Sequence, residues 1–424
     1  MLKKMISANN AKKKSSSTSE SASGAGATSS AGATSPALKP PGGQQLFAVC
    51  AHGFEPFTRQ ELVRLGLSTT NPPAESSSQI AQEEEAGGIS FSGELEAIYR
   101  ANLQLRTASR VLLRFGQFHA AAFSELRRKA NSLPWELYLS PGQPVAVRTT
   151  CHKSRLYHSA AVAREVTAAI GDRLGTQPEL LPFSEELETQ LLIVRLVDDE
   201  CTISVDTSGA LLHRRGYRLA TAKAPLRETL AAAMLLASGW DTLSTLLDPF
   251  CGSGTIPIEA ALMARNLPPG AVRRFAFMDW PDYDQALWEK LLLESQDLLR
   301  KELPPIQASD RDAGAIQMAQ ANAERAGVAQ YIEFTCRAVS AIEPEGTGWV
   351  VTNPPYGLRV RSAHDLRNLY AQFGKVLRKN CPGWQVAILC SELPLLQASG
   401  LTLDTSIAWV NGGVPVRLGR GVVE

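Results

Sequence analysis

The sequence lacks the features that mark membrane-spanning, disulfide-linked and metal-binding proteins. Its 424 residues contain no uncharged apolar run of about 18 residues, which a membrane-spanning helix would need. The seven cysteines include no C-x-x-C pair and are irregularly spaced, so we expect reduced thiols in an intracellular, cytoplasmic protein. The six histidines form no cluster with metal-ligand spacing, and we predict no metal site.

The sequence also has almost no net charge, +1 at neutral pH, so its overall composition does not indicate a nucleic-acid partner. The charge is unevenly distributed, however. Nine Lys or Arg residues and only two acids lie between residues 101 and 160, and a second basic run, from Arg214 to Arg227, contains no acid at all. Such patches fit a phosphate-binding face, although solvated helix surfaces give the same pattern.

The first 45 residues have almost nothing to bury. Residues 15–36 are nearly all Ser, Thr, Ala and Gly, and five lysines lie within the first 14 positions. We therefore predict a disordered tail over residues 1–45. A flexible basic tail is favoured over an organelle import sequence, because the segment has no arginine and no amphipathic pattern.

Two regions with different element patterns follow the tail. From residue 46 to 209, strands and helices alternate with hairpin-like strand pairs, which predicts an α+β region with one sheet covered by helices. Residues 210–223 form a basic connector. From residue 224 to 424 the pattern is strictly strand then helix, which predicts a doubly wound α/β domain with a parallel sheet. The strands expected there are 245–248, 306–310, 331–336, 349–353 and 384–390, and the helices are 255–265, 313–326 and 365–379.

A glycine loop joins the first of these strands to its helix, in LLDPFCGSGTIPIEAALMA (246–264). Gly252 and Gly254 let the backbone approach a ligand at a helix amino terminus. The loop has neither the G-K-[ST] of a triphosphate site nor the G-x-G-x-x-G of a dinucleotide fold, so phosphate binding is disfavoured. Asp248 would repel phosphate but could accept hydrogen bonds from an amino or hydroxyl group. The structural alternative is a tight turn with packing glycines.

Two further sites follow at the ends of later strands. Asp310 ends the second strand, where an acid commonly binds ribose hydroxyls, whereas Asp312 could be a helix N-cap. The stretch TNPPYG (352–357) follows the apolar run 349–351, and it is either an ordinary strand exit or the rim of an active site.

The stretches DPFCGSGT (248–255) and NPPYG (353–357) resemble those of S-adenosylmethionine-dependent amino-methyltransferases. Together with residues 87–113, 212–218 and 224–233, they resemble a narrower family, the THUMP-domain RNA guanine-N2-methyltransferases of the large-subunit (23S) ribosomal RNA methyltransferase L type. The resemblance runs from about residue 46 to the C-terminus. It implies a ferredoxin-like segment (46–89), a THUMP RNA-binding domain (90–209) and a Rossmann-like methyltransferase domain (224–424).

The resemblance also implies roles for individual residues. S-adenosylmethionine would be bound by the glycine loop and the second strand end, and the amine by the NPPY stretch, with Tyr356 stacking on the base. Structured RNA would contact the basic patches. The cofactor residues are Asp248, Phe250, Cys251, Gly252, Gly254, Thr255, Asp310 and Arg311; the catalytic residues are Asn353, Pro354, Pro355 and Tyr356; the RNA-binding residues are Arg148, Lys153, Arg155, Arg214 and Arg215.

One position departs from the family pattern. Most relatives have an Asp after the third strand that binds the adenine amine, and here Ala338 takes its place, with Ser340 as a neighbouring substitute. The implied function is methylation of a guanine N2 amine in 23S ribosomal RNA. The alternatives are a tRNA guanine, a DNA adenine or protein glutamine substrate, or an RNA-binding ribosome-assembly protein with a weakened methyltransferase pocket.

Overall fold

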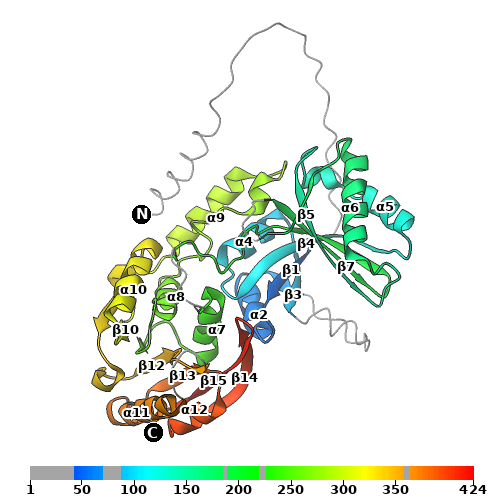
Figure 1. Cartoon of the computed structure of the whole chain (residues 1–424). Helices are drawn as coiled ribbons and strands as arrows, with labels where there is room; N and C mark the ends of the chain where they lie inside the picture. Colours follow the sequence, from blue (N-terminus) through cyan, green and yellow to red (C-terminus); the bar gives the residue numbers. More distant parts are fainter. Residues whose placement is uncertain (1–42, 70–86, 185–188, 219–225, 358–362) are drawn as a thin grey trace.

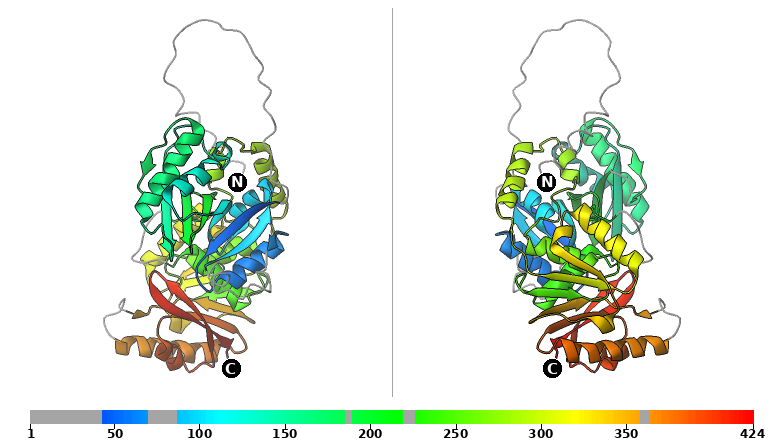
Figure 2. Two further views of the ribbon diagram at one scale, coloured as in Figure 1. Left: turned by 90° about the vertical axis from the view of Figure 1, so that its right-hand side faces the viewer. Right: turned by 90° about the vertical axis from the view of Figure 1, so that its left-hand side faces the viewer.

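The computed structural model describes residues 43–69, 87–184, 189–218, 226–357 and 363–424. The expected tail (1–45) lies almost wholly outside these ranges. Within them the chain builds two sheets, an N-terminal one in blue to green and a C-terminal one in green to red (Figures 1 and 2). No helix in the described ranges is long and apolar enough to cross a membrane.

The N-terminal region forms one continuous sheet with the strand order β2-β3-β1-β4-β8-β7-β5-β6. The central strand β4 pairs with β1 on one side and with β8 on the other, so it joins the two halves of the sheet. The boundary expected between residues 89 and 90 falls inside β3, which pairs with β1. The elements are β1 (Gln44–Cys50), α2 (Glu55–Arg64), β2 (Ser68–Thr69), β3 (Gly88–Gly93), α4 (Leu95–Gln104), β4 (Ala108–His119), α5 (Phe123–Asn131), β5 (Val145–His152), α6 (Ser159–Leu174), β6 (Leu180–Leu181), β7 (Gln190–Val197) and β8 (Glu200–Asp206).

The C-terminal region confirms the predicted doubly wound sheet and adds a hairpin to it. Five parallel strands stand in the order β11-β10-β9-β12-β13, and the antiparallel pair β15-β14 extends the sheet beyond β13. That hairpin, and the helices α7, α9 and α12, were not predicted. The elements are α7 (Glu228–Ser238), β9 (Thr245–Asp248), α8 (Thr255–Ala264), α9 (Gln285–Asp297), β10 (Ile306–Asp310), α10 (Ala313–Ala326), β11 (Ile332–Cys336), β12 (Gly348–Thr352), α11 (Ala363–Asn380), β13 (Gln385–Cys390), α12 (Leu393–Ala398), β14 (Asp404–Asn411) and β15 (Val414–Val422).

The two regions exchange parts of their hydrophobic cores. The segment between α8 and β10, which includes α9, packs into the N-terminal core, where Phe277 stacks on Tyr99 of α4 with ring centroids 4.3 Å apart. In return Phe54, which precedes α2, joins the C-terminal core and contacts the Trp409 ring edge-on at 5.2 Å. Figure 1 shows α9 beside α4 and the β14–β15 hairpin beside α2. Since each region buries apolar side chains of the other, they form one packed body.

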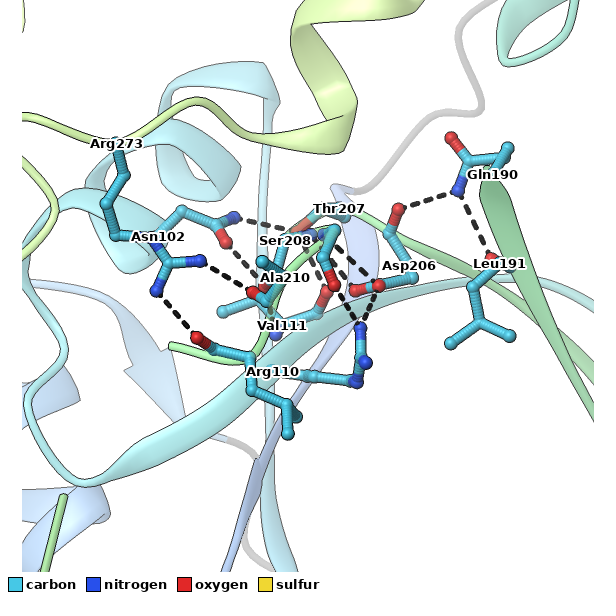
Figure 3. A network of polar contacts seen from close by, with 12 residues as sticks. Asn102, Arg110, Val111, Gln190, Leu191, Asp206, Thr207, Ser208, Ala210 and Arg273 are labelled. Carbon is cyan, nitrogen blue, oxygen red and sulfur yellow. Dashed lines mark hydrogen bonds and ion pairs between the residues drawn. The ribbon is translucent and has the colours of Figure 1, made fainter. Parts of the chain in front are cut away.

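A buried polar network fixes the start of the connector (Figure 3). Asp206 ends β8 and forms an ion pair with Arg110 of β4. Arg110 also donates to the Gly209 carbonyl, and Arg273 donates to the carbonyls of Ala210, at 2.6 Å, and Leu211, at 2.9 Å. Arg273 comes from the segment before α9, so the connector is held from both regions.

Candidate active site

The loop between β9 and α8 has the conformation that its glycines make possible. Gly252 has φ +51° and Gly254 has φ +83°, and a side chain is strained at such angles. A Cβ atom on Gly254 would also lie 2.9 Å from the Cβ atom of Ala319 in α10. Gly254 therefore allows the start of α8 to pack directly against α10.

Three amide groups of the loop are already hydrogen-bonded within the protein and are not offered to a phosphate. Cys251 N donates to Ser309 O at 3.0 Å, Gly252 N to the Asp310 carboxylate at 3.0 Å, and Gly254 N to Cys251 O at 2.8 Å. A phosphate cradle needs such N–H groups unpaired and pointing at the ligand. This pattern agrees with the absence of a phosphate-binding motif in the sequence.

Asp248 is buried at the end of β9, with 1% of its surface exposed. Its carboxylate accepts hydrogen bonds from Thr352 Oγ1 at 2.6 Å and from Phe250 N at 3.2 Å. It thus links β9 to the end of β12, directly before Asn353. Burial raises the pKa of Asp248 from 3.8 to about 7, and the nearby charge of Asp310 contributes to the rise.

Asp310 lies at the end of the neighbouring strand β10. One carboxylate oxygen accepts from Gly252 N, and the other accepts from Asp312 N at 3.0 Å. Asp312 itself accepts from Gly314 N at 2.8 Å as the N-cap of α10, so the alternative structural role considered for it is confirmed.

A cavity of about 1060 Å³ opens along the carboxyl ends of these strands. It brings together most of the candidate residues: Asp248, Phe250, Cys251, Gly252, Thr255, Asp310, Arg311, Asn353, Pro354 and Pro355 all line it, as do Ala338 and Ser340. Sequence reasoning missed the helical wall formed by Met318, Leu366, Leu369 and Gln372 of α10 and α11. The spacing of those residues is that of any core-facing helix, so it carried no distinct signal.

Asn353 presents an unused hydrogen-bond acceptor at this cavity. Its Oδ1 atom is buried and has no hydrogen-bond partner among the described residues. Leaving a buried acceptor unpaired costs about 1–3 kcal/mol. A ligand N–H group at this oxygen would recover that free energy.

Tyr356 does not lie where a stacking residue was expected. Only 5% of its surface is exposed, it is absent from the cavity lining, and its hydroxyl accepts from Asn411 Nδ2 at 3.1 Å. In this conformation the Tyr356 ring is packed in the core beneath the turn, so it does not offer a face to a base.

Four of the five candidate RNA-binding residues are exposed, namely Arg148, Lys153, Arg155 and Arg214. The prediction is wrong for Arg215, which has 4% of its surface exposed. Its guanidinium donates to the carbonyls of Leu212 and Arg106 and lies 3.6 Å from the Glu259 carboxylate. These interactions hold Arg215 inside the protein, away from an RNA surface.

The residues of the large cavity fit S-adenosylmethionine. Two carboxylates stand at adjacent strand ends, where Asp248 suits a cationic amino group and Asp310 suits ribose hydroxyls. The paired loop amides disfavour a phosphate-bearing cofactor instead. No group of three or more His, Cys, Asp or Glu side chains with metal-binding geometry occurs within the described ranges.

Comparison with known families divides the chain into three matched parts. Residues 45–112 match the family described as the RlmL ferredoxin-like domain, residues 120–206 match the THUMP domain, and residues 215–414 match the RMKL-like methyltransferase domain.

Individual relatives cover most of the chain. A Synechocystis protein named "putative RNA methyltransferase" is 34% identical over 88% of this chain and 95% of its own length. The ribosomal RNA large subunit methyltransferase K/L of Methylococcus capsulatus is 34% identical over 89% of this chain. This chain covers only 51% of that protein, so it spans about half the length of the K/L relatives.

A solved structure with the same architecture contains a bound cofactor product. It is described as a putative methyltransferase complexed with SAH, and it superposes with a TM-score of 0.77 at 28% identity. The match covers 90% of this chain and 99% of the other.

Proposed function

Because this chain belongs to the family of THUMP-containing, S-adenosylmethionine-dependent RNA methyltransferases, we propose that it methylates the exocyclic N2 amine of a guanine in structured ribosomal RNA. The observation that carries the choice of an amine is the unpaired, buried Oδ1 atom of Asn353 at the cavity. An exocyclic amine carries N–H groups, and one of them could donate the hydrogen bond that Asn353 Oδ1 does not receive from the protein.

The proposed role of Asn353 is to prepare a weak nucleophile. The lone pair of a guanine N2 amine is delocalised into the ring. When Asn353 Oδ1 and the Pro354 carbonyl accept its two N–H groups, the nitrogen moves toward tetrahedral geometry and its lone pair becomes directed. Pro354 and Pro355 stiffen this turn and remove two backbone donors that would compete with the amine.

The glycine loop and the two strand-end acids hold the cofactor in this proposal. S-adenosylmethionine supplies an electrophilic methyl group. Asp248 would face the cationic methionine end, Gly252 would allow the close approach of the backbone, and Asp310 would bind the ribose hydroxyls, while Gly254, outside the cavity lining, would support the loop through the packing of α8 on α10. Phe250, Cys251, Thr255 and Arg311 complete the wall. No side chain forms a covalent intermediate, and the amine releases its proton to water after transfer.

Two observations bear on the choice of RNA. The K/L relatives carry ribosomal RNA in their names, which supports a ribosomal substrate over a tRNA guanine. The exposed basic residues Arg148, Lys153, Arg155 and Arg214 supply a surface for the phosphate backbone. The NPPY turn by itself also suits a DNA adenine or a protein glutamine, and it is the THUMP domain that favours RNA.

A second candidate function rests on Ala338. It lines the cavity where the family pattern has an acid for the adenine amine, and Ser340 is the polar side chain beside it. An RNA-binding assembly protein with a weakened cofactor pocket would have lost that contact. Calorimetry with S-adenosylhomocysteine separates the two functions, because the assembly protein is expected to show no binding.

The central test is Asn353→Ala. We expect the turnover number on ribosomal RNA to fall about a hundredfold or more, since one hydrogen bond made to the reacting group is worth several kcal/mol in catalysis. The affinity for S-adenosylhomocysteine should stay near normal. Methyl transfer would be measured by mass spectrometry of RNA nucleosides, which also identifies N2-methylguanosine directly.

Asn380→Ala is the matched control. Asn380 lies outside the cavity and donates to the Ile342 carbonyl at 2.8 Å, so its loss should leave turnover unchanged. Retained turnover in the Asn353 variant would contradict the role given to that residue, and methylation of another atom would overturn the choice of guanine N2.

A further inference from the structure

A second cavity lies at the opposite ends of α8 and α10 from the active-site cavity. It measures about 520 Å³ and is lined by Leu262 and Arg265 at the end of α8 and by Arg325 and Gly327 at the end of α10. The active-site cavity instead touches the beginnings of the same helices. The two cavities share no lining residue, so the second is a separate site.

The charged side chains that line the second cavity are all arginines. Its lining includes Arg215, Arg265 and Arg325 and no Asp or Glu. Arg265 bonds to the Tyr331 hydroxyl, and Arg325 donates to the Tyr217 carbonyl at 2.7 Å and to the Asn322 amide oxygen. Because these partners are neutral, the charges of Arg265 and Arg325 are not offset by an ion pair among the described residues.

Two buried donors at this cavity have no acceptor. Arg215 Nε and Gln296 Nε2 are both buried and lack a hydrogen-bond partner in the described part of the chain. Glu259, 3.6 Å from Arg215 Nε, offsets its charge without forming a hydrogen bond. An acceptor-rich ligand in the cavity would satisfy donors of this kind.

Helix capping explains only part of this arrangement. Cations at the ends of α8 and α10 complement the helix dipoles, which accounts for Arg265 and Arg325 in structural terms. It does not account for an amide donor buried without a partner on a third helix, α9, which carries Gln296. A ligand accounts for both.

The remaining wall of the cavity is apolar. Leu262, Leu267, Pro268, Pro269 and Leu299 contribute to it. A volume of this size exceeds what a phosphate ion needs, and paired prolines beside leucines suit a flat ring. The ligand that combines a flat ring, hydrogen-bond acceptors and negative charge is a nucleotide.

We propose that this cavity binds a nucleoside monophosphate unit, with the phosphate at Arg265 and Arg325, the base against the proline wall and Gln296 donating to the base. The unit is either one nucleotide of the RNA chain or a free nucleotide. Binding at this site does not depend on methyl transfer, so its test is separate from that of the proposed function.

The test is calorimetry of the full chain with guanosine 5′-monophosphate, guanosine and inorganic phosphate, in the presence of S-adenosylhomocysteine to fill the cofactor part of the active site. The monophosphate should bind about tenfold or more tightly than guanosine or phosphate alone, because charge-assisted hydrogen bonds and ring contacts then act together. Arg265→Gln should weaken its binding about tenfold.

Gln296→Leu separates binding from folding. Removing an unsatisfied buried donor should leave thermal stability unchanged or raised, while the affinity for the monophosphate falls about tenfold. Arg300→Gln is the control, since Arg300 lies outside the cavity and bonds to Thr242 at 3.1 Å. Absence of monophosphate binding, or equal losses in the Arg265 and Arg300 variants, would overturn the proposal.

RNA competition then distinguishes the source of the nucleotide. If the RNA supplies it, guanosine 5′-monophosphate competes with RNA in filter binding, and Gln296→Leu weakens RNA binding. If the ligand is a free nucleotide, it binds without displacing RNA and the variant keeps its RNA affinity.

Discussion

At the scale of single residues, Asp248 couples the active site to pH. Its pKa lies near 7 in the folded protein because the carboxyl group is buried, against 3.8 for an exposed one. The folded-state pKa is raised, so the associated stability is fully present below about pH 4 and is lost as the pH rises toward 7. The ionised form of Asp248 is therefore destabilised by burial unless a cation binds next to it.

This leads to a prediction for cofactor binding. S-adenosylhomocysteine carries a cationic amino group, so its affinity should increase as the pH rises through about 7 and Asp248 loses its proton. The increase should approach about tenfold per pH unit below that value. Calorimetry in two buffers of different ionisation enthalpy should show proton release on binding.

Asp248→Asn provides the comparison for this prediction. The variant keeps the shape of the side chain and cannot ionise, so its weaker affinity should not change with pH. A pH dependence equal to that of the unchanged protein would assign the titration to another group.

At the scale of elements, the β9–α8 loop combines a strained backbone with a close helix contact. Gly254 is the N-cap of α8 in the left-handed conformation and has no space for a Cβ atom against Ala319. Gly239 caps the end of α7 with a similar φ of +76°, but nothing lies within 4 Å of a Cβ placed there. A side chain at Gly239 would therefore meet only the cost of a positive φ, whereas a side chain at Gly254 would meet this cost and a steric clash as well.

We predict that Gly254→Ala is more harmful than Gly239→Ala. Both variants should lose about 1–2 kcal/mol of unfolding free energy from the positive φ. Gly254→Ala should lose about 1–3 kcal/mol more, because α8 must move away from α10. Urea unfolding gives these values, and calorimetry should show weakened cofactor binding in the Gly254 variant alone. Equal losses of unfolding free energy in the two variants would mean that α8 can move away from α10 at no cost.

At the scale of the whole molecule, RNA binding and catalysis are assigned to distant parts of one packed body. Figure 1 shows β5 and α6 on the side of the molecule away from α10 and α11. Lys153 and Arg155 follow β5 and are exposed, whereas Asn353 lies at the end of β12. The shared cores, with Phe277 on Tyr99 and Trp409 on Phe54, hold these parts in a fixed relation.

The corresponding prediction concerns Lys153→Ala combined with Arg155→Ala. RNA affinity should fall, and the slope of log affinity against log salt should become shallower by about one for each lost phosphate contact. Cofactor affinity should not change. Arg173→Ala is the control, because two hydrogen bonds to Glu136, at 2.6 and 3.1 Å, hold this exposed arginine, whereas Arg155 lies 3.7 Å from the Asp199 carboxylate. An unchanged salt slope in the double variant would remove both residues from the RNA surface.

The sequence by itself determined the alternation of strands and helices that builds the parallel sheet, and it pointed to the glycine loop after β9 as a ligand-binding loop. Short apolar runs between helical segments are typical of buried parallel strands. For this reason β9 and β10 were predicted with the bounds observed. Gly252, Gly254, Asp248 and Asp310 were predicted as cofactor residues because glycines at a helix start and acids at the carboxyl ends of parallel strands are typical of ligand-binding loops in such sheets, and all but Gly254 line the large cavity.

Only the tertiary structure decided which side chains are exposed and which regions share a core. Arg215 and Arg214 are neighbours of the same charge, yet only the fold shows that one is enclosed by carbonyls and Glu259 while the other faces outward. Tyr356 is buried for a similar reason, since Asn411 of the unpredicted β14 meets its hydroxyl. Contacts between residues distant in the chain leave no periodic trace in the sequence, because packing depends on where whole elements meet.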